Sequence, residues 1–127
     1  MTRATHLPST SAPTFALPGI QFVGFASPSR NSHQLCTWQI TVDAGLVSPT
    51  AHTLDRDEVF MVTEGVLVLQ EGAPPAGPGD TVVVPAGQPI RLSNPGATPA
   101  TALVAISAGF SASAEDGTPI PTPPWAQ

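Results

Sequence analysis

Residues 48–94 read SPTAHTLDRDEVFMVTEGVLVLQEGAPPAGPGDTVVVPAGQPIRLSN, and this stretch decides the fold. It contains two β-forming segments joined by a Pro/Gly-rich turn. The first segment carries His52 and Glu58, and the second carries a Gly-Asp turn, a run of valines and a Pro-x-Gly turn. Short runs of Val and Thr bounded by Gly and Pro are typical of short strands. The stretch therefore indicates a β fold, but it does not identify a substrate.

The same pattern extends in both directions from this stretch and predicts short strands along most of the chain. A two-residue turn at Glu64-Gly65 lies between two β runs and predicts a hairpin of residues 58–63 with 66–70. The expected strands are one or two within 15–25, then 33–43, 51–54, 58–63, 66–70, 81–84, 90–93 and 98–107.

Length and composition indicate one all-β domain. The chain has 127 residues, 41% of them hydrophobic, and its 16 Pro and 11 Gly interrupt it too often for long helices. We expect residues 1–13 to form a flexible arm and residues 14–110 a single barrel domain. The Pro-rich residues 111–127 are predicted to pack on the barrel or on a partner subunit, with Trp125 as anchor.

The charge pattern argues against several classes of partner. The net charge is −5, and the four basic residues are scattered arginines, so no basic face for nucleic acid is expected. No apolar run is long enough to span a bilayer, and we expect no membrane partner. The single cysteine, Cys36, forms no internal disulfide, and the N-terminal residues lack a signal-peptide pattern. We therefore expect a cytoplasmic protein.

Residues 33–43 alternate between a mixed face and an apolar face. The mixed face includes Gln39 and, by parity, His33, while the apolar face includes Cys36, Trp38 and Ile40. We predict that the apolar set faces a core or an interface. The mixed set has the character of a partly polar pocket wall, and equally of a solvated face.

The first half of the central stretch resembles the first motif of the cupin superfamily, G-x5-H-x-H-x3-4-E-x6-G. His52, Leu54, Glu58 and Gly65 occupy its H, H, E and G positions at matching spacing, while Gly45 lies one residue further upstream than the pattern requires. Tight turns with positive φ explain the glycines. An alternative alignment moves His52 to the second His position and Thr50 to the first, with five residues before the glutamate.

The second half resembles the second cupin motif, G-x5-P-x-G-x2-H-x3-N. Gly79, Pro85, Gly87, Ile90 and Asn94 occupy it with every spacing kept. The resemblance implies a double-stranded β-helix, which is a jelly-roll barrel open at one end. It also implies that the four ligand positions of the two motifs point into the barrel.

The departures from the two motifs bear on the cofactor. Metal-binding cupins hold the ion with three His and one Glu, but here Leu54 and Ile90 occupy two of the His positions. Only His52 and Glu58 are left, and a catalytic metal site normally has about three protein ligands. We therefore predict no cofactor. The alternative is a divalent transition metal held by His52, Glu58 and His33, with Gln39 and Cys36 as weaker third ligands.

Without a metal, two readings of His52 and Glu58 remain. They form a general acid–base pair acting on a small ligand, or a hydrogen-bonded buried pair inherited from an ancestral metal site. The predicted ligand pocket is largely apolar and comprises Gln39, Leu54, Phe60, Ile90 and Leu92. Trp38 and Trp125 are interpreted as packing residues, with ligand stacking as the alternative.

Two classes of function follow. The first is a cupin-like protein that binds a small, largely apolar organic molecule in its barrel, with a metal-free or weakly metal-binding site. The second is an enzyme of the isomerase, cyclase or dioxygenase type that uses His52 and Glu58, with a metal completed by His33. A structural or regulatory module is a third interpretation. By family analogy we expect a homodimer.

Overall fold

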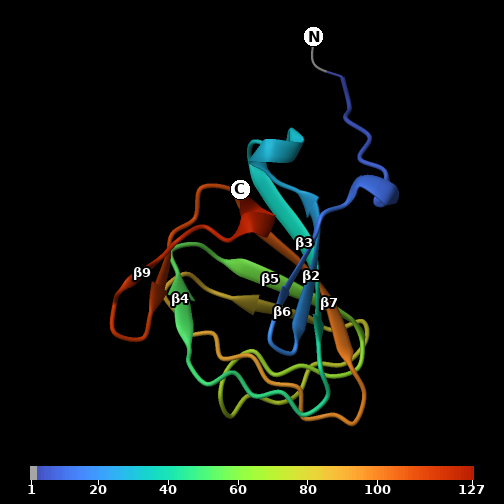
Figure 1. The fold of residues 1–127 in the computed structure, drawn as a ribbon. Coiled ribbons are helices and arrows are strands. Elements are labelled where there is room, and N and C mark those ends of the chain that lie inside the picture. The colour runs from blue at the N-terminus through green and yellow to red at the C-terminus, as the bar shows by residue number, and fades with distance from the viewer. Residues whose placement is uncertain (1–2) are drawn as a thin grey trace.

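The computed structural model describes residues 3–127, which form short strands and three single-turn 3₁₀ helices (Figure 1). The 3₁₀ helices are η1 (Ser9–Ser11), η2 (Pro28–Arg30) and η3 (Pro124–Ala126). The strands are β1 (Thr14–Leu17), β2 (Ile20–Ala26), β3 (Leu35–Val42), β4 (His52–Leu54), β5 (Glu58–Glu64), β6 (Thr81–Val84), β7 (Ala100–Ser107), β8 (Ala112–Ala114) and β9 (Pro119–Ile120). The all-β prediction is confirmed. No helix in this part of the chain is long and apolar enough to cross a membrane.

One wall of the molecule is an antiparallel sheet of six strands in the order β1-β2-β3-β7-β5-β6. Its register aligns Trp38, Val104 and Phe60 on three neighbouring strands, and all three side chains are buried. Because side chains alternate across a strand, every second residue of β3 and β7 is buried and those between are partly exposed. The buried set faces the interior of the barrel.

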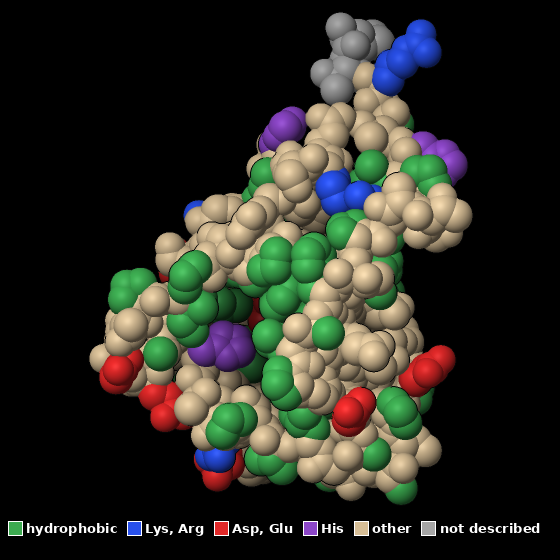
Figure 2. Space-filling view, viewed as in Figure 1, with side chains coloured by type: hydrophobic (Ala, Val, Ile, Leu, Met, Phe, Trp, Pro, Cys, Tyr) green, Lys and Arg blue, Asp and Glu red, His purple; other side chains and the backbone are tan. Residues whose placement is uncertain are grey.

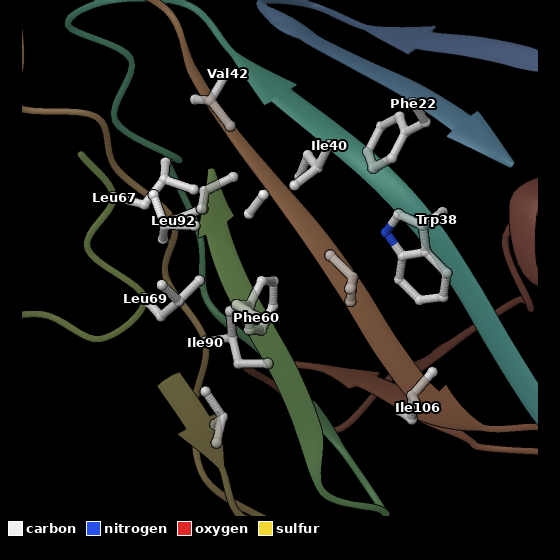
Figure 3. Close-up of a cluster of buried hydrophobic side chains, with 14 of the residues drawn as sticks. Phe22, Trp38, Ile40, Val42, Phe60, Leu67, Leu69, Ile90, Leu92 and Ile106 are labelled. Carbon is white, nitrogen blue, oxygen red and sulfur yellow. The ribbon is translucent and has the colours of Figure 1, made fainter. Parts of the chain in front are cut away.

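The opposite wall is less regular. It contains the three-stranded sheet β4-β8-β9, and isolated bridges extend it through the loops. His52 is bonded to Ile90 in both directions, with N–O distances of 3.0 and 2.8 Å. A second bridge joins Val68 to Ser93. The two walls enclose one apolar core, part of which Figure 3 shows with Phe22, Trp38 and Phe60 directed into it.

The predicted hairpin of residues 58–63 with 66–70 is wrong. β5 pairs with β6 on one side and with β7 on the other, so it has no free edge for a third partner. After Gly65, whose φ is +67°, residues 67 and 68 bridge to Ala76 and Ser93 instead. Residues 90–93 likewise form bridges rather than a regular strand.

The C-terminal residues form two strands of the barrel wall. β8 pairs with β4, aligning Ala114 with His52, and β9 pairs with β8. The chain end is held by Ser29, whose hydroxyl donates to the carbonyl oxygen of Gln127 at 2.6 Å. Residues 111–127, predicted to pack on the barrel or on a partner subunit, therefore supply strands to one wall of this chain.

Candidate functional site

A cavity of about 350 Å³ lies between the two walls of the barrel. Figure 2 shows it as a hollow walled by hydrophobic side chains, with a histidine at its edge. Its lining comes from strands of both walls and from the C-terminal segment. It includes Leu17, Ile20, Phe22, Trp38, Ile40, Ser48, Thr50, Ala51, His52, Leu54, Glu58, Phe60, Leu69, Ile90, Leu92, Phe110, Ala112, Ala114, Ile120, Pro123 and Trp125.

The four positions that the cupin motifs reserve for metal ligands all line this cavity. His52 and Leu54 lie two residues apart on β4, so their side chains leave the strand on the same side. Ile90 is bridged to His52, and Glu58 begins β5 on the opposite wall. The motif spacing therefore places two polar and two apolar side chains around one space.

Glu58 is the buried charged group of the cavity wall. Its side chain is 5% exposed, and its strand neighbours in register are Val84 and Ile106. Burial raises the pKa of this carboxyl from its ordinary 4.5 to about 7, because an apolar environment disfavours the charged form. Burial is the sole cause of the shift, and no charged or hydrogen-bonding partner among residues 3–127 contributes to it.

The oxygens of Glu58 are open to the cavity. Within the described chain, every fully enclosed side-chain oxygen or nitrogen has a hydrogen-bond partner. The carboxyl of Glu58 has none among these residues, so its oxygens must keep accessible surface, and the cavity supplies it. A carboxyl in this situation is able to accept a hydrogen bond from a bound molecule or to exchange a proton with it.

His52 lies at the opposite wall and is half-buried. Burial lowers the pKa of its imidazole below the ordinary value, which favours the neutral ring. Among the described residues, neither ion pair involves His52 or Glu58. Among residues 3–127, the hydrogen-bonded pair of His52 with Glu58 that one interpretation of the sequence expected is therefore not formed, and the two groups line the cavity separately.

His33 does not join this pair. The sequence placed it on a strand, but β3 begins at Leu35, and His33 lies exposed on the bend before it and outside the cavity lining. Cys36 is buried under the chain end, where its thiol donates to the carbonyl oxygen of Ala126 at 3.6 Å. Burial raises the pKa of this thiol, as expected of an unreactive cysteine.

The positions of the His, Cys, Asp and Glu side chains decide whether the cavity could hold a transition metal. No group of three or more His, Cys, Asp or Glu side chains comes together in residues 3–127. At the motif positions, Leu54 and Ile90 present carbon atoms, which cannot donate to a metal. Two donors fall short of the usual set, so the residues of this cavity do not fit a tightly held ion.

The predicted pocket residues divide into two groups. Leu54, Phe60, Ile90 and Leu92 line the cavity, but Gln39 does not. Gln39 is part of the outward-facing set of β3, while Trp38 and Ile40 of the alternate set line the cavity. The sequence reading treated core and pocket as opposite faces of a strand. In a barrel both lie on the inner face, which is the reason for the error.

The C-terminal segment supplies lining residues that the sequence reading missed. Phe110, Ala112, Ala114, Ile120 and Pro123 all border the cavity. The short alternation of residues 110–114, in which Phe and Ala alternate with Ser, was the available signal for a strand with one apolar face. Trp125 also borders the cavity and packs on Phe22, so packing is observed and ligand stacking stays a prediction.

Comparisons with known proteins agree with the observed fold. The profile of the family described as "Cupin domain" matches residues 38–106, more than half of the chain. A search of curated proteins found no match. Among solved structures, an RmlC-like cupin protein from Ralstonia eutropha superposes with a TM-score of 0.75 at 12% identity, covering 97% of this chain and 80% of that one.

Two further solved structures are similar over most of their length. A cupin-superfamily sugar phosphate isomerase from Silicibacter pomeroyi has a TM-score of 0.69 at 23% identity, covering 93% of this chain and 98% of that one. The polyketide cyclase RemF from Streptomyces resistomycificus has a TM-score of 0.68 at 17% identity, covering 84% and 80%. At these identities the likeness shows the fold, and the predicted jelly-roll barrel is confirmed.

Proposed function

Because the chain belongs to the cupin family, we propose that it binds a small, largely apolar organic molecule inside its barrel. The observation that carries this proposal is the cavity of about 350 Å³, whose wall is apolar except at a few positions. Ligand sites of proteins typically have a volume of about 300–1,000 Å³ and combine hydrophobic walls with few polar groups. The cavity is at the small end of this range, so the ligand is small.

The charge of the wall narrows the class of ligand. The described residues that line the cavity include no Arg, and the chain has no Lys. A phosphate or a sulfate would find no cationic partner there and would face the carboxyl of Glu58. We therefore favour an uncharged hydrophobic or aromatic molecule over a sugar phosphate.

Binding is testable through the two tryptophans of the chain, since Trp38 and Trp125 both line the cavity. Their indole N–H signals in a ¹H–¹⁵N correlation spectrum give two local probes. A fragment library of neutral aromatic and alicyclic molecules should contain members that shift both signals in a saturable way. A library that shifts neither signal would overturn the proposal.

A filled cavity provides the matched control. Ile90→Trp places a large side chain in the cavity and should abolish binding of every hit. Val83→Trp adds the same ring at a residue that is 55% exposed and outside the lining, and should leave binding unchanged. Equal binding by the two variants would place the ligand elsewhere.

A second candidate function is acid–base catalysis on the bound molecule, as an isomerase or cyclase. The observation that favours it is the unpartnered carboxyl of Glu58, whose pKa of about 7 suits proton transfer near neutral pH. The similar structures include a cyclase and an isomerase, which agrees with this class. The oxygenase alternative with a metal completed by His33 lacks its third ligand, because His33 lies outside the cavity lining.

Substitution tests this second candidate. Once screening finds a turnover, Glu58→Gln should abolish it while leaving binding intact, and His52→Ala should lower it strongly. Unchanged turnover in both variants would end this candidate and leave the binding proposal standing. Homodimer formation and a cytoplasmic location stay predictions, and sedimentation equilibrium of the purified protein tests the first.

A further inference from the structure

Glu58 differs from every other buried polar residue of the described chain. The buried polar residues there are Ser27, Glu58 and Asn94. Asn94 is fully hydrogen-bonded to backbone groups, and the hydroxyl of Ser27 lies 3.3 Å from that of Ser29. Glu58 alone of the three lines the cavity, and its carboxyl lacks a partner among residues 3–127.

The hydroxyl and imidazole groups of the lining come from the opposite wall, while Trp38 on the same wall as Glu58 carries a donor, its indole N–H. The Ser48 hydroxyl already donates to the carbonyl oxygen of Thr50 at 3.1 Å. Thr50 is exposed, and His52 is half-buried, which favours its neutral form. Around Glu58 itself the neighbours in register are Val84 and Ile106. A molecule that fills the cavity therefore meets one deeply buried acceptor group, the carboxyl of Glu58, which needs a hydrogen-bond partner from that molecule.

We infer that the ligand carries a neutral hydroxyl group on an apolar body, and that this hydroxyl donates a hydrogen bond to the carboxyl of Glu58. The inference rests on the proposed binding function and specifies the chemical class of the ligand. A hydroxyl donates one hydrogen bond, which gives the otherwise unpartnered carboxyl a partner. A hydrocarbon of the same shape would leave the carboxyl buried and unpaired, at a cost in affinity.

Charged ligands fit this arrangement less well. A ligand carboxylate would meet Glu58 with no arginine among the described lining residues to compensate. An ammonium group would bring three donors to a wall that offers one buried acceptor group, and it would lose its hydration on entry. A neutral hydroxyl gives the carboxyl a hydrogen-bond partner without bringing a second charge into the cavity.

A matched set of probes tests the inference on the intact chain. The probes are 2-naphthol, 2-methylnaphthalene, 2-naphthoate and 2-naphthylmethylamine, which share one apolar body and differ in the polar group. Dissociation constants come from titrations that follow the indole signals of Trp38 and Trp125. We expect 2-naphthol to bind roughly tenfold more tightly than 2-methylnaphthalene, as one additional hydrogen bond allows. The two charged probes should bind more weakly than 2-naphthol.

Variants then locate the preference at Glu58. Glu58→Met keeps the length of the side chain and removes the acceptor, so the preference for 2-naphthol should fall to about one or invert. Glu58→Gln keeps an acceptor oxygen and should retain part of the preference for 2-naphthol. Glu64→Met, at the exposed end of the same strand, should behave as the unchanged protein. The dispersion of each correlation spectrum verifies that the variant is folded.

The outcomes separate this inference from the binding proposal. If 2-methylnaphthalene and 2-naphthol bind equally, or if the preference survives in Glu58→Met, the hydroxyl inference is wrong while the apolar binding site stands. Tighter binding of the carboxylate or of the amine would also overturn it. If no probe shifts either indole signal, the binding proposal fails, and the inference fails with it.

Discussion

The indole of Trp125 lies flat on the phenyl ring of Phe22, with ring centroids 3.7 Å apart and planes 9° from parallel. Phe15 and Trp38 approach the same indole in tilted orientations, at 6.1 and 6.5 Å. Both stacked rings also line the cavity. The contact that fastens the C-terminal segment to β2 is therefore part of the proposed ligand site, and loss of the indole should affect both stability and binding.

Trp125→Ala should lower the free energy of unfolding by about 2 kcal/mol, since a half-buried indole loses its apolar contacts and its stacking partner. Urea denaturation followed by circular dichroism measures this change. The variant should also bind every ligand found by screening with lower affinity. Thr122→Ala, an exposed residue of the same segment, is the control and should be neutral. An equal, small effect of both substitutions would show that the stack contributes nothing to stability.

The pKa of Glu58 predicts an unusual dependence of stability on pH. In the folded protein it is raised to about 7, whereas the ordinary value of 4.5 applies to the unfolded chain. The folded state thus holds the proton more tightly, and its contribution is fully present below pH 4.5. As the pH rises to about 7, the unfolded state loses the proton first, and stability falls by about 3 kcal/mol. Above that pH the loss is constant.

Glu58→Gln should remove this dependence, because the amide does not titrate. The difference in unfolding free energy between the variant and the unchanged protein should grow with pH between 4.5 and about 7 and then level off, with the variant the more stable. Glu64→Gln on the exposed end of β5 is the matched control. A difference that is the same at every pH would show that Glu58 titrates normally in the folded state.

The fold was predictable because turn residues and strand composition are local signals. Gly65, Gly79 and Gly87 have positive φ values, which glycine adopts without strain, and they occupy positions of the cupin motifs, a resemblance that implied the barrel. The same motifs located His52 and Glu58 at one cavity. Strand pairing between distant segments has no comparable local signal. The pairing of β4 with β8, which brings residues 112–114 to the cavity, therefore could not be predicted.

Alternation of residue types indicated correctly that Trp38 and Ile40 share a face with Cys36, but not that the cavity belongs to that face. In a closed barrel the core and the ligand space share the inner surface, so an apolar face is compatible with both. The lowered pKa of His52 and the unpaired carboxyl of Glu58 depend on burial, which only the tertiary structure determines.

Asn94, the last residue of the second motif, should be important for stability rather than for binding. It is 1% exposed, and its amide nitrogen donates to the carbonyl oxygens of Val42 and Thr98 at 3.1 and 3.0 Å. Its side-chain oxygen accepts from the backbone nitrogen of Gly96 at 2.9 Å. Asn94→Ala leaves three backbone groups without these partners and should cost about 3 kcal/mol of unfolding free energy.

Asn94→Asp distinguishes the two hydrogen bonds that the Asn94 side chain donates from the one that it accepts. The carboxylate still accepts from Gly96 but donates to neither carbonyl oxygen, so we expect a loss at least as large as that of Asn94→Ala at neutral pH. Gln88→Ala provides a control, since Gln88 is exposed. A change below about 1 kcal/mol for both Asn94 variants would contradict this role.

Restoring the missing histidines should restore metal binding. Leu54 and Ile90 line the same cavity as His52 and Glu58 and occupy the positions where metal-binding cupins have histidine. Leu54→His combined with Ile90→His would supply a set of three imidazoles and one carboxylate, which suits a divalent transition metal. We expect stoichiometric Ni²⁺ or Co²⁺ in the double variant by elemental analysis after dialysis. Leu92→His, at a lining residue outside the motif positions, should not hold the ion. Metal retention by the unchanged protein at the same stoichiometry would contradict the conclusion that its own residues do not fit a metal.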